Sequence, residues 1–268
     1  MNKKVSIDEI ILSMRNINSL TKSKNSVRAW TVHNSLAHEP HSTHEATKHV
    51  VQILDTKYEK GDLMAITDNC THLSDPNKQK LLELLQKFEE LFDGTLGDWD
   101  CEPVSLQLRE GAKPYHGRPF PIPKKHVDIT KKEIQRLCDL GVLQWQADSE
   151  WASPTFIIPK KDNTVRVVSD FRELNKRIVR KPFPIPKIST VLQELEGFTY
   201  ATALDLNMGY YTIRLDPDAS KICTIIFPWG KYSYLRLPMG VACSPDIFQA
   251  MMSELIATLE FIRTYSFN

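Results

Sequence analysis

Asp205 is the residue whose position most suggests chemistry. It is the one carboxylate in an apolar, β-prone run that begins at Tyr200. Gly197 before the run and Gly209 after it favour turns, so a buried strand of roughly six residues should emerge into a turn at Asp205. A carboxylate at such a strand end can bind a metal ion, but Asp more commonly caps a turn. The residue types alone leave both roles open.

A basic segment from Pro154 to Lys187 is the second candidate. It holds nine Lys or Arg residues against three acids, whereas the whole chain has a net charge of only +1. Two β-prone runs within the segment, 153–158 and 165–168, flank a polar turn at 159–164 and predict a hairpin with a basic tip. Such a run of charge is equally compatible with a solvated surface and with a phosphate-binding surface.

Several motifs follow one another in a fixed order along the chain. They are Asp170-Phe171-Arg172-Glu173-Leu174-Asn175-Lys176, then Lys181-Pro182-Phe183-Pro184-Ile185-Pro186, then Leu204-Asp205 with Tyr210, and finally Leu237-Pro238-Met239-Gly240 with Ser244-Pro245 and Phe248-Gln249. With these motifs the chain resembles a reverse transcriptase, and more narrowly the polymerase of gypsy-type LTR retrotransposon polyproteins. The resemblance covers about residues 51–265 and is strongest after Pro103.

This resemblance implies an α+β fold with the fingers and a partial palm of the right-hand polymerase type. We expect a poorly ordered, partly disordered polar tract at 1–50, a linker with an amphipathic helix at 51–102, and fingers and partial palm at 103–268. The linker helix should open at Ser74-Asp75-Pro76 and end at Gly94, and a second amphipathic helix should span 126–140.

The later motifs should be joined by further short elements. We predict helices at 170–176, 188–195 and from Pro245 onward, with Asp170 and Ser244 as caps. The segment Tyr211–Leu215 should return as a strand beside Asp205, and 224–227 and 232–235 should form a hairpin over a Pro-Gly turn. We interpret Asp216-Pro217-Asp218 as a turn rather than a metal pair.

The resemblance also assigns roles to single side chains in the hairpin. Lys160 or Lys161, together with Arg166, would meet the triphosphate of the incoming deoxynucleoside triphosphate. A cation is suitable there because the leaving pyrophosphate gains negative charge during phosphoryl transfer.

Other assigned roles concern the sugar, the base and the template. Tyr210 would lie under the sugar and exclude a 2′-hydroxyl, and Met239 and Gly240 would line the pocket against sugar and base. Arg172 would contact the template strand. Ordinary packing is the alternative for Tyr210, and an ion pair with Asp170 or Glu173 is the alternative for Arg172.

The metal site is where the sequence departs from the family. Reverse transcriptases use two Mg²⁺ (or Mn²⁺) ions about 3.5 to 4 Å apart, and the resemblance assigns to them Asp205 and the backbone carbonyl of Leu206. One Asp cannot clamp two ions, since Mg²⁺ requires an octahedron of oxygens. The family takes two more carboxylates from a Tyr-x-Asp-Asp turn, but Phe267 and Asn268 occupy those two positions here.

We therefore expect a truncated RNA-directed DNA polymerase of a retrotransposon that is inactive alone. Its partners by family are an RNA/DNA primer-template and deoxynucleoside triphosphates. Two alternatives remain open, a non-catalytic nucleic-acid-binding remnant and a non-functional pseudogene product.

Composition excludes several other classes of protein. With 41% hydrophobic and 25% charged residues, the chain can bury a sizeable core. It has no apolar run of about 18 to 20 residues and no signal-peptide pattern, so we expect no membrane contact and an intracellular location.

The five cysteines form no C-x₂-C pair and fit reduced thiols. Five of eight histidines lie in 1–50, but their spacing matches no zinc motif.

Overall fold

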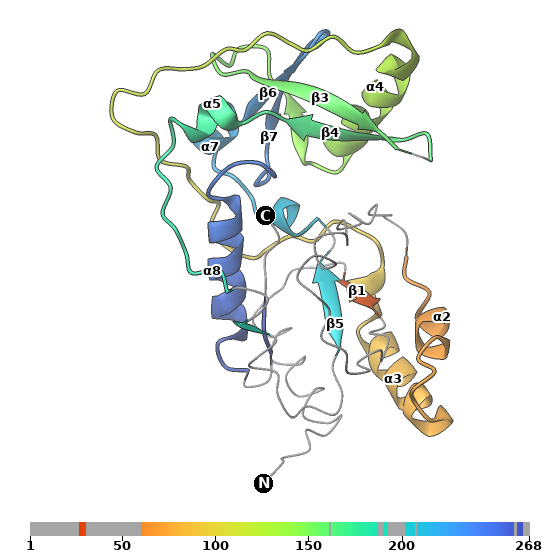
Figure 1. The fold of residues 1–268 in the computed structure, drawn as a ribbon. Helices are drawn as coiled ribbons and strands as arrows, with labels where there is room; N and C mark the ends of the chain where they lie inside the picture. Colours follow the sequence, from red (N-terminus) through yellow and green to blue (C-terminus); the bar gives the residue numbers. More distant parts are fainter. Residues whose placement is uncertain are drawn as a thin grey trace, which may run out of the picture. The chain divides into compact units, whose positions relative to one another are not determined.

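The computed structural model describes residues 27–30, 60–160, 162–186, 190–191, 202–206, 208–259 and 262–264, with only the backbone described at 27–30, 203 and 205. The chain divides into two compact units. The first includes the described residues of 24–95 and 197–208, and the second those of 96–196 and 209–268. Figure 1 shows the helices and strands that make up the two units.

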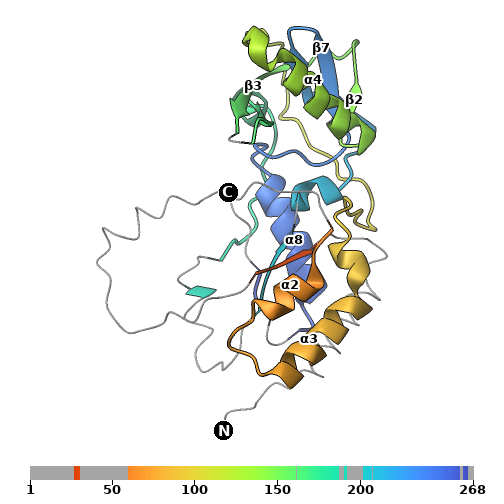
Figure 2. The ribbon, with the colours of Figure 1, turned by 90° about the vertical axis from the view of Figure 1, so that its right-hand side faces the viewer.

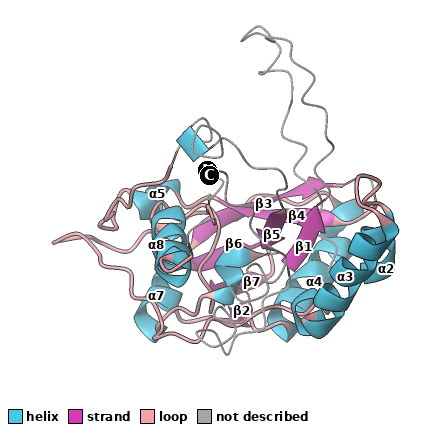
Figure 3. Cartoon of the chain, turned by 90° about the horizontal axis from the view of Figure 1, so that it is seen from below, coloured by secondary structure: helices cyan, strands magenta, loops and turns pink. Residues whose placement is uncertain are grey.

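The first unit combines a two-stranded antiparallel sheet with a pair of helices. Its elements are β1 (Val27–Trp30), α2 (Leu63–Asp68), α3 (Asp75–Lys87), the 3-10 helix η1 (Glu89–Phe92) and β5 (Ala203–Leu206). Helices α2 and α3 lie side by side (Figure 3). Leu63, Leu85 and Phe92 are buried together, and Leu206 of β5 packs against them. Burying these apolar side chains stabilises the unit.

The second unit is built on a five-stranded sheet with the order β2-β7-β6-β3-β4. Its strands are β2 (Leu143–Trp145), β3 (Ser153–Pro159), β4 (Val165–Ser169), β6 (Thr224–Phe227) and β7 (Gly230–Tyr234). Strands β3 and β6 run parallel, and the other neighbours are antiparallel. Helix α4 (Lys124–Asp139) packs on this sheet beside β2 and buries Ile134 and Leu137 (Figure 2).

Shorter elements of the second unit connect the sheet to its last helix. They are α5 (Arg172–Asn175), the 3-10 helix η2 (Gly209–Thr212), α7 (Pro217–Ile222) and α8 (Ser244–Ile256). No helix in the described part of the chain is long and apolar enough to cross a membrane.

The structure confirms the predicted hairpins and amphipathic helices. Strands β3 and β4 form the basic hairpin, with Ile158 opposite Arg166, and β6 and β7 form the second hairpin. Helices α3 and α4 match the expected segments, although α3 ends at Lys87 and is followed by η1 before Gly94. Mixed helices and sheets confirm the expected α+β class.

The predicted strand at Tyr211–Leu215 is wrong. Gly209–Thr212 is a 3-10 helix, closed by a hydrogen bond of 2.6 Å from Thr212 Oγ1 to the Gly209 carbonyl. Arg214 and Leu215 form only isolated bridges, and β5 pairs with β1 instead. The residues are β-prone, but this local hydrogen bond and packing in the second unit outweigh that preference.

Three predicted caps and turns also differ from the structure. Asp216 is the N-cap of α7 and accepts a hydrogen bond of 2.6 Å from Ala219 N, so Asp216-Pro217-Asp218 begins a helix rather than forming an isolated turn. Cys243, and not Ser244, occupies the N-cap of α8. Phe171 occupies the N-cap of α5, while Asp170 just before it accepts from Arg172 N at 3.2 Å.

Several expectations concern residues outside the described part of the chain. Of the N-terminal tract only β1 is described, and of the expected helix at 188–195 only residues 190–191. Lys161, Phe267 and Asn268 also lie outside the described residues.

Candidate nucleotide-binding site

The tip of the β3–β4 hairpin is a tightly closed loop. Lys160 N donates to the Thr164 carbonyl at 2.9 Å. Asp162 Oδ1 accepts from Thr164 N at 3.0 Å and from Thr164 Oγ1 at 2.6 Å, and these hydrogen bonds hold the pKa of Asp162 below its usual value. Asn163 adopts a positive φ of 61°, which Asn tolerates in turns. These bonds connect Lys160 and Asp162 to Thr164 across the tip of the hairpin.

Arg166 lies on β4, the strand that follows this loop. It is half-buried, and three residues further on β4 ends at Ser169. A Cβ placed on Gly240 would lie 3.6 Å from the Ser169 carbonyl oxygen and 3.6 Å from Phe171 Cδ2. Since a strand rises about 3.3 Å per residue, Arg166 lies roughly 10 Å along β4 from the Met239–Gly240 loop.

The Met239–Gly240 loop is tied to α5 by Asn175. Asn175 Nδ2 donates to the Gly240 carbonyl at 2.9 Å, and Asn175 Oδ1 accepts from Ala242 N at 2.8 Å. Gly240 has a φ of +90°, which only glycine adopts readily. Met239 is 53% exposed, so the loop faces solvent. Its backbone is bound on the other side by the Asn175 amide.

Tyr210 approaches the same helix that follows this loop. Its ring packs edge-on against Phe248 of α8, with 5.3 Å between ring centroids. Burial raises the pKa of the Tyr210 phenol, and the negative charge of Asp246 raises it further. Tyr210 is therefore a half-buried ring packed against α8.

Arg172 is fixed by an ion pair to a neighbouring carboxylate. Its Nε and Nη2 donate to the two carboxylate oxygens of Asp170 at 2.8 and 2.7 Å. This pairing is the alternative that the sequence left open for Arg172. The Arg172 side chain is nevertheless 83% exposed, so it can still meet a phosphate from solvent.

Asp205 and Leu206 belong to the first unit, where both lie in β5. Asp205 is the third of the four residues of this strand, opposite Arg28 in the register. Among the described residues, no three His, Cys, Asp or Glu side chains gather as a metal-binding group. Since two Mg²⁺ ions need several carboxylates, the described residues do not form a two-metal site.

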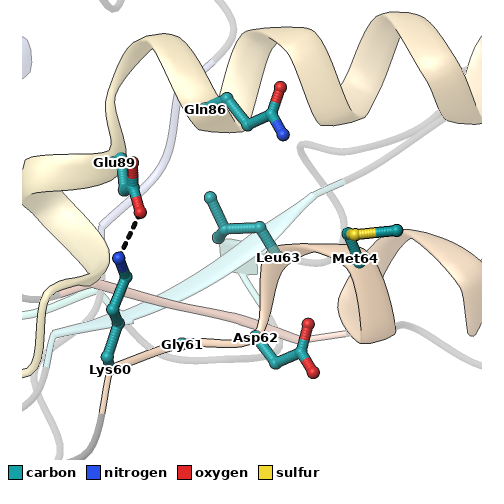
Figure 4. A pocket seen from close by; sticks show the side chains of 7 residues that line it. All are labelled: Lys60, Gly61, Asp62, Leu63, Met64, Gln86 and Glu89. Atoms are coloured by element: carbon teal, nitrogen blue, oxygen red, sulfur yellow. Dashed lines mark ion pairs between the residues drawn. The ribbon is translucent and has the colours of Figure 1, made fainter.

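A shallow hollow in the first unit is lined by α2, α3 and the chain around them (Figure 4). Its charged groups already serve the local fold. Lys60 pairs with Glu89, and Asp62 caps α2 by accepting from Ala65 N at 3.0 Å. The hollow contains none of the residues to which the sequence assigned a role.

Comparison with known proteins identifies the family. The model of the family "Reverse transcriptase (RNA-dependent DNA polymerase)" matches residues 158–267. The chain contains a reverse transcriptase domain. The match includes the β3–β4 loop, α5, Tyr210 and the Met239–Gly240 loop.

Retrotransposon polyproteins are similar to this reverse transcriptase domain and its flanks. The "Retrovirus-related Pol polyprotein from transposon 412" of Drosophila melanogaster is 28% identical over 207 residues, which are 69% of this chain and 17% of the relative. The corresponding polyprotein from transposon opus is 30% identical over 190 residues, 68% of this chain and 19% of the relative. The chain thus spans less than a fifth of these relatives.

Solved structures agree on the fold. The foamy viral protease-reverse transcriptase in complex with an RNA/DNA hybrid superposes with a TM-score of 0.69 at 24% identity, covering 76% of this chain and 28% of that one. The native prototype foamy virus protein gives a TM-score of 0.67 at 26% identity, with the same two coverages. The mixed α+β fold of this chain is that of a reverse transcriptase.

Some residues important to the site were missed by sequence reasoning. Asn175 was noted only as part of a motif, and Ser244 only as a cap, yet Ser244 Oγ donates to the Pro238 carbonyl at 2.7 Å. Asp246 has no motif to mark it, although it is 2% exposed and bound by Arg180. No local sequence pattern marks these partners, because each pairs with a residue distant in the chain.

Proposed function

We propose that this chain is the nucleotide- and template-binding part of a retrotransposon reverse transcriptase, an RNA-directed DNA polymerase. The observation that carries the proposal is the family match over residues 158–267. It includes the closed basic loop at Lys160, Arg166 on β4, and the Met239–Gly240 loop near the end of that strand. Cations at one end and an exposed loop at the other suit a triphosphate and a nucleoside, respectively.

The proposed partners are an RNA/DNA primer-template and deoxynucleoside triphosphates. Lys160, or Lys161, and Arg166 bind the triphosphate, Tyr210 excludes the 2′-hydroxyl, and Arg172 contacts the template. A related foamy viral protein has been solved with an RNA/DNA hybrid, which supports the choice of nucleic acid.

Binding measurements test this proposal. Replacing the guanidinium in Arg166→Gln should weaken dTTP binding by about 10- to 150-fold, because a charge-assisted hydrogen bond contributes about 1.5 to 3 kcal/mol. Lys132→Gln removes an exposed charge from α4 and is the matched control. Equal affinity of wild type, Arg166→Gln and Lys132→Gln for dTTP would contradict the proposal.

Template binding has its own test. Affinity for an RNA template with a DNA primer should fall steeply with salt, since phosphate contacts release counterions. Arg172→Gln should reduce the slope of log K against log salt by about one, whereas Lys80→Gln on α3 should leave it unchanged. Binding that is independent of salt would contradict the proposed interface.

We further propose that the 268-residue polypeptide does not polymerise alone. Mg²⁺ (or Mn²⁺) is the ion that the family uses, and Asp205 with the Leu206 carbonyl would contribute to its binding. Phe267 and Asn268 occupy the positions of the paired aspartates. Without those carboxylates the electrostatic stabilisation of the transition state is lost.

A further inference from the structure

We infer that Asn175 is a positioning residue for the nucleoside, holding the Met239–Gly240 loop in its binding conformation. The inference rests on the proposed function and goes beyond it, because no role had been assigned to Asn175. It belongs to α5, 65 residues before Gly240 in the chain, and meets the loop only through folding.

The loop has little packing of its own to hold it. Met239 is 53% exposed and Gly240 has no side chain. Glycine adopts the positive φ of Gly240 readily, so the backbone conformation itself does not fix the loop in one position. The flanking Leu237 and Val241 are buried and hold the two ends of the loop, so side-chain hydrogen bonds are needed mainly to fix the exposed peptide units between them.

Two side chains provide those hydrogen bonds, one on each side of the loop. Ser244 Oγ, fully buried at the start of α8, donates to the Pro238 carbonyl at 2.7 Å. Asn175 uses both ends of its amide, donating to the Gly240 carbonyl and accepting from Ala242 N. The pair of bonds fixes the peptide units on either side of Val241, so rotation of the loop would break both.

Asn is the side chain suited to this task. A donor and an acceptor are needed about one carboxamide width apart, and Asn provides both without charge. Asp would offer the Gly240 carbonyl only another acceptor, and Ala would offer neither group. The Phe171 ring beside Gly240 limits the loop on its inner side.

Positioning by Asn175 should affect the nucleoside and not the triphosphate. The cations at Lys160 and Arg166 stand on the hairpin, which Asn175 does not contact through any hydrogen bond shown for its amide. A ligand that is only a chain of phosphates would use the hairpin without the loop. Comparing dTTP with inorganic tripolyphosphate therefore separates the two parts of the site.

The experiment measures both affinities by calorimetry for wild type, Asn175→Ala, Ser244→Ala and the control Gln144→Ala, which changes an exposed amide on β2. We expect dTTP binding to weaken about tenfold in Asn175→Ala, and also in Ser244→Ala, with tripolyphosphate binding unchanged. Gln144→Ala should match wild type for both ligands.

Two other results would overturn the inference. A parallel loss of both ligands in Asn175→Ala would mean that the residue only stabilises the fold, and no loss of either would mean that the loop does not need it. A wild type that binds neither ligand would refute the proposed function itself, together with this inference. The failure of each claim is therefore distinguishable.

Discussion

The ion pair between Arg180 and Asp246 gives the most quantitative test of how the second unit is held together. Asp246 is 2% exposed, and its carboxylate accepts from Arg180 Nε at 2.6 Å, from Arg180 Nη2 at 3.2 Å and from Phe183 N at 3.1 Å. These bonds tie the extended segment after Ile178 to the first turn of α8. The perturbation we consider is Asp246→Asn.

The magnitude follows from the burial of each partner. Breaking a fully buried ion pair costs about 3 to 5 kcal/mol. The Arg180 side chain is 46% exposed and can turn to water, and the Asn oxygen can still accept from Phe183 N. We therefore expect Asp246→Asn to lower the free energy of unfolding at pH 7 by about 2 kcal/mol, the range of one charge-assisted hydrogen bond.

The effect of pH has a definite sign. Burial by itself raises the pKa of the Asp246 carboxyl. The hydrogen bonds from Arg180 and from Phe183 N lower this pKa by more than burial raises it, so the pKa lies below the usual 3.8. A depressed folded pKa means that this stabilisation is present above about pH 3.8 and is lost as pH falls through the folded pKa. The difference between wild type and Asp246→Asn should therefore narrow in acid.

Urea unfolding followed by circular dichroism between pH 7 and pH 3 is the assay. Arg180→Met in both backgrounds completes a double-mutant cycle, and the two single effects should not add. Asp218→Asn is the control, because the Asp218 side chain is 95% exposed. A loss below about 0.5 kcal/mol at pH 7, or a difference in stability that stays constant as the pH falls to 3, would show that the Arg180–Asp246 ion pair does not stabilise the second unit.

Two further predictions concern packing and thiol reactivity. A Cβ at Gly117 would lie 2.5 Å from Pro154 Cγ, so Gly117→Ala should destabilise the protein by about 2 kcal/mol through overpacking. Gly61→Ala is the control and should change stability little, because a Cβ at Gly61 would make ordinary contacts of 3.5 Å or more. Similar unfolding midpoints for the two variants in urea would contradict this prediction. The Cys223 residue has 0% exposure, and this burial raises the pKa of its thiol. Iodoacetamide at pH 8 should therefore label Cys223 far more slowly than the partly exposed Cys101 as long as the protein is folded. Peptide mass spectrometry measures both rates, and equal labelling of the two thiols in the native protein would be the contrary result.

The sequence predicted those parts of the fold that depend on local patterns. The β3–β4 hairpin follows from two β-prone runs around a polar turn, and α4 follows from its helical periodicity. The strand predicted at Tyr211–Leu215 is absent because β-propensity depends strongly on the surroundings of a residue. Thr212 closes a 3-10 turn on Gly209, and Tyr210 packs on Phe248, which lies far along the chain.

Within the site, the sequence predicted the residues but not the hydrogen bonds that hold them in place. Arg166, Tyr210, Met239 and Gly240 follow from motifs, and the structure places them in one unit. The hydrogen bonds of Asn175 to residues 65 and 67 positions away depend on tertiary structure. A short polar helix such as α5 gives no local indication of such a partner.

Primer extension measures whether the 268-residue chain polymerises alone. The 268-residue chain and its Asp205→Asn variant would be incubated with poly(rA)·oligo(dT), dTTP and Mg²⁺ or Mn²⁺, after each has been shown to bind the primer-template. We expect binding by both proteins and extension by neither above background, because the resemblance to the family puts Phe267 and Asn268 at the positions of two metal-binding carboxylates. Extension by the wild type that disappears in Asp205→Asn would contradict it and would mean that other carboxylates complete the metal site.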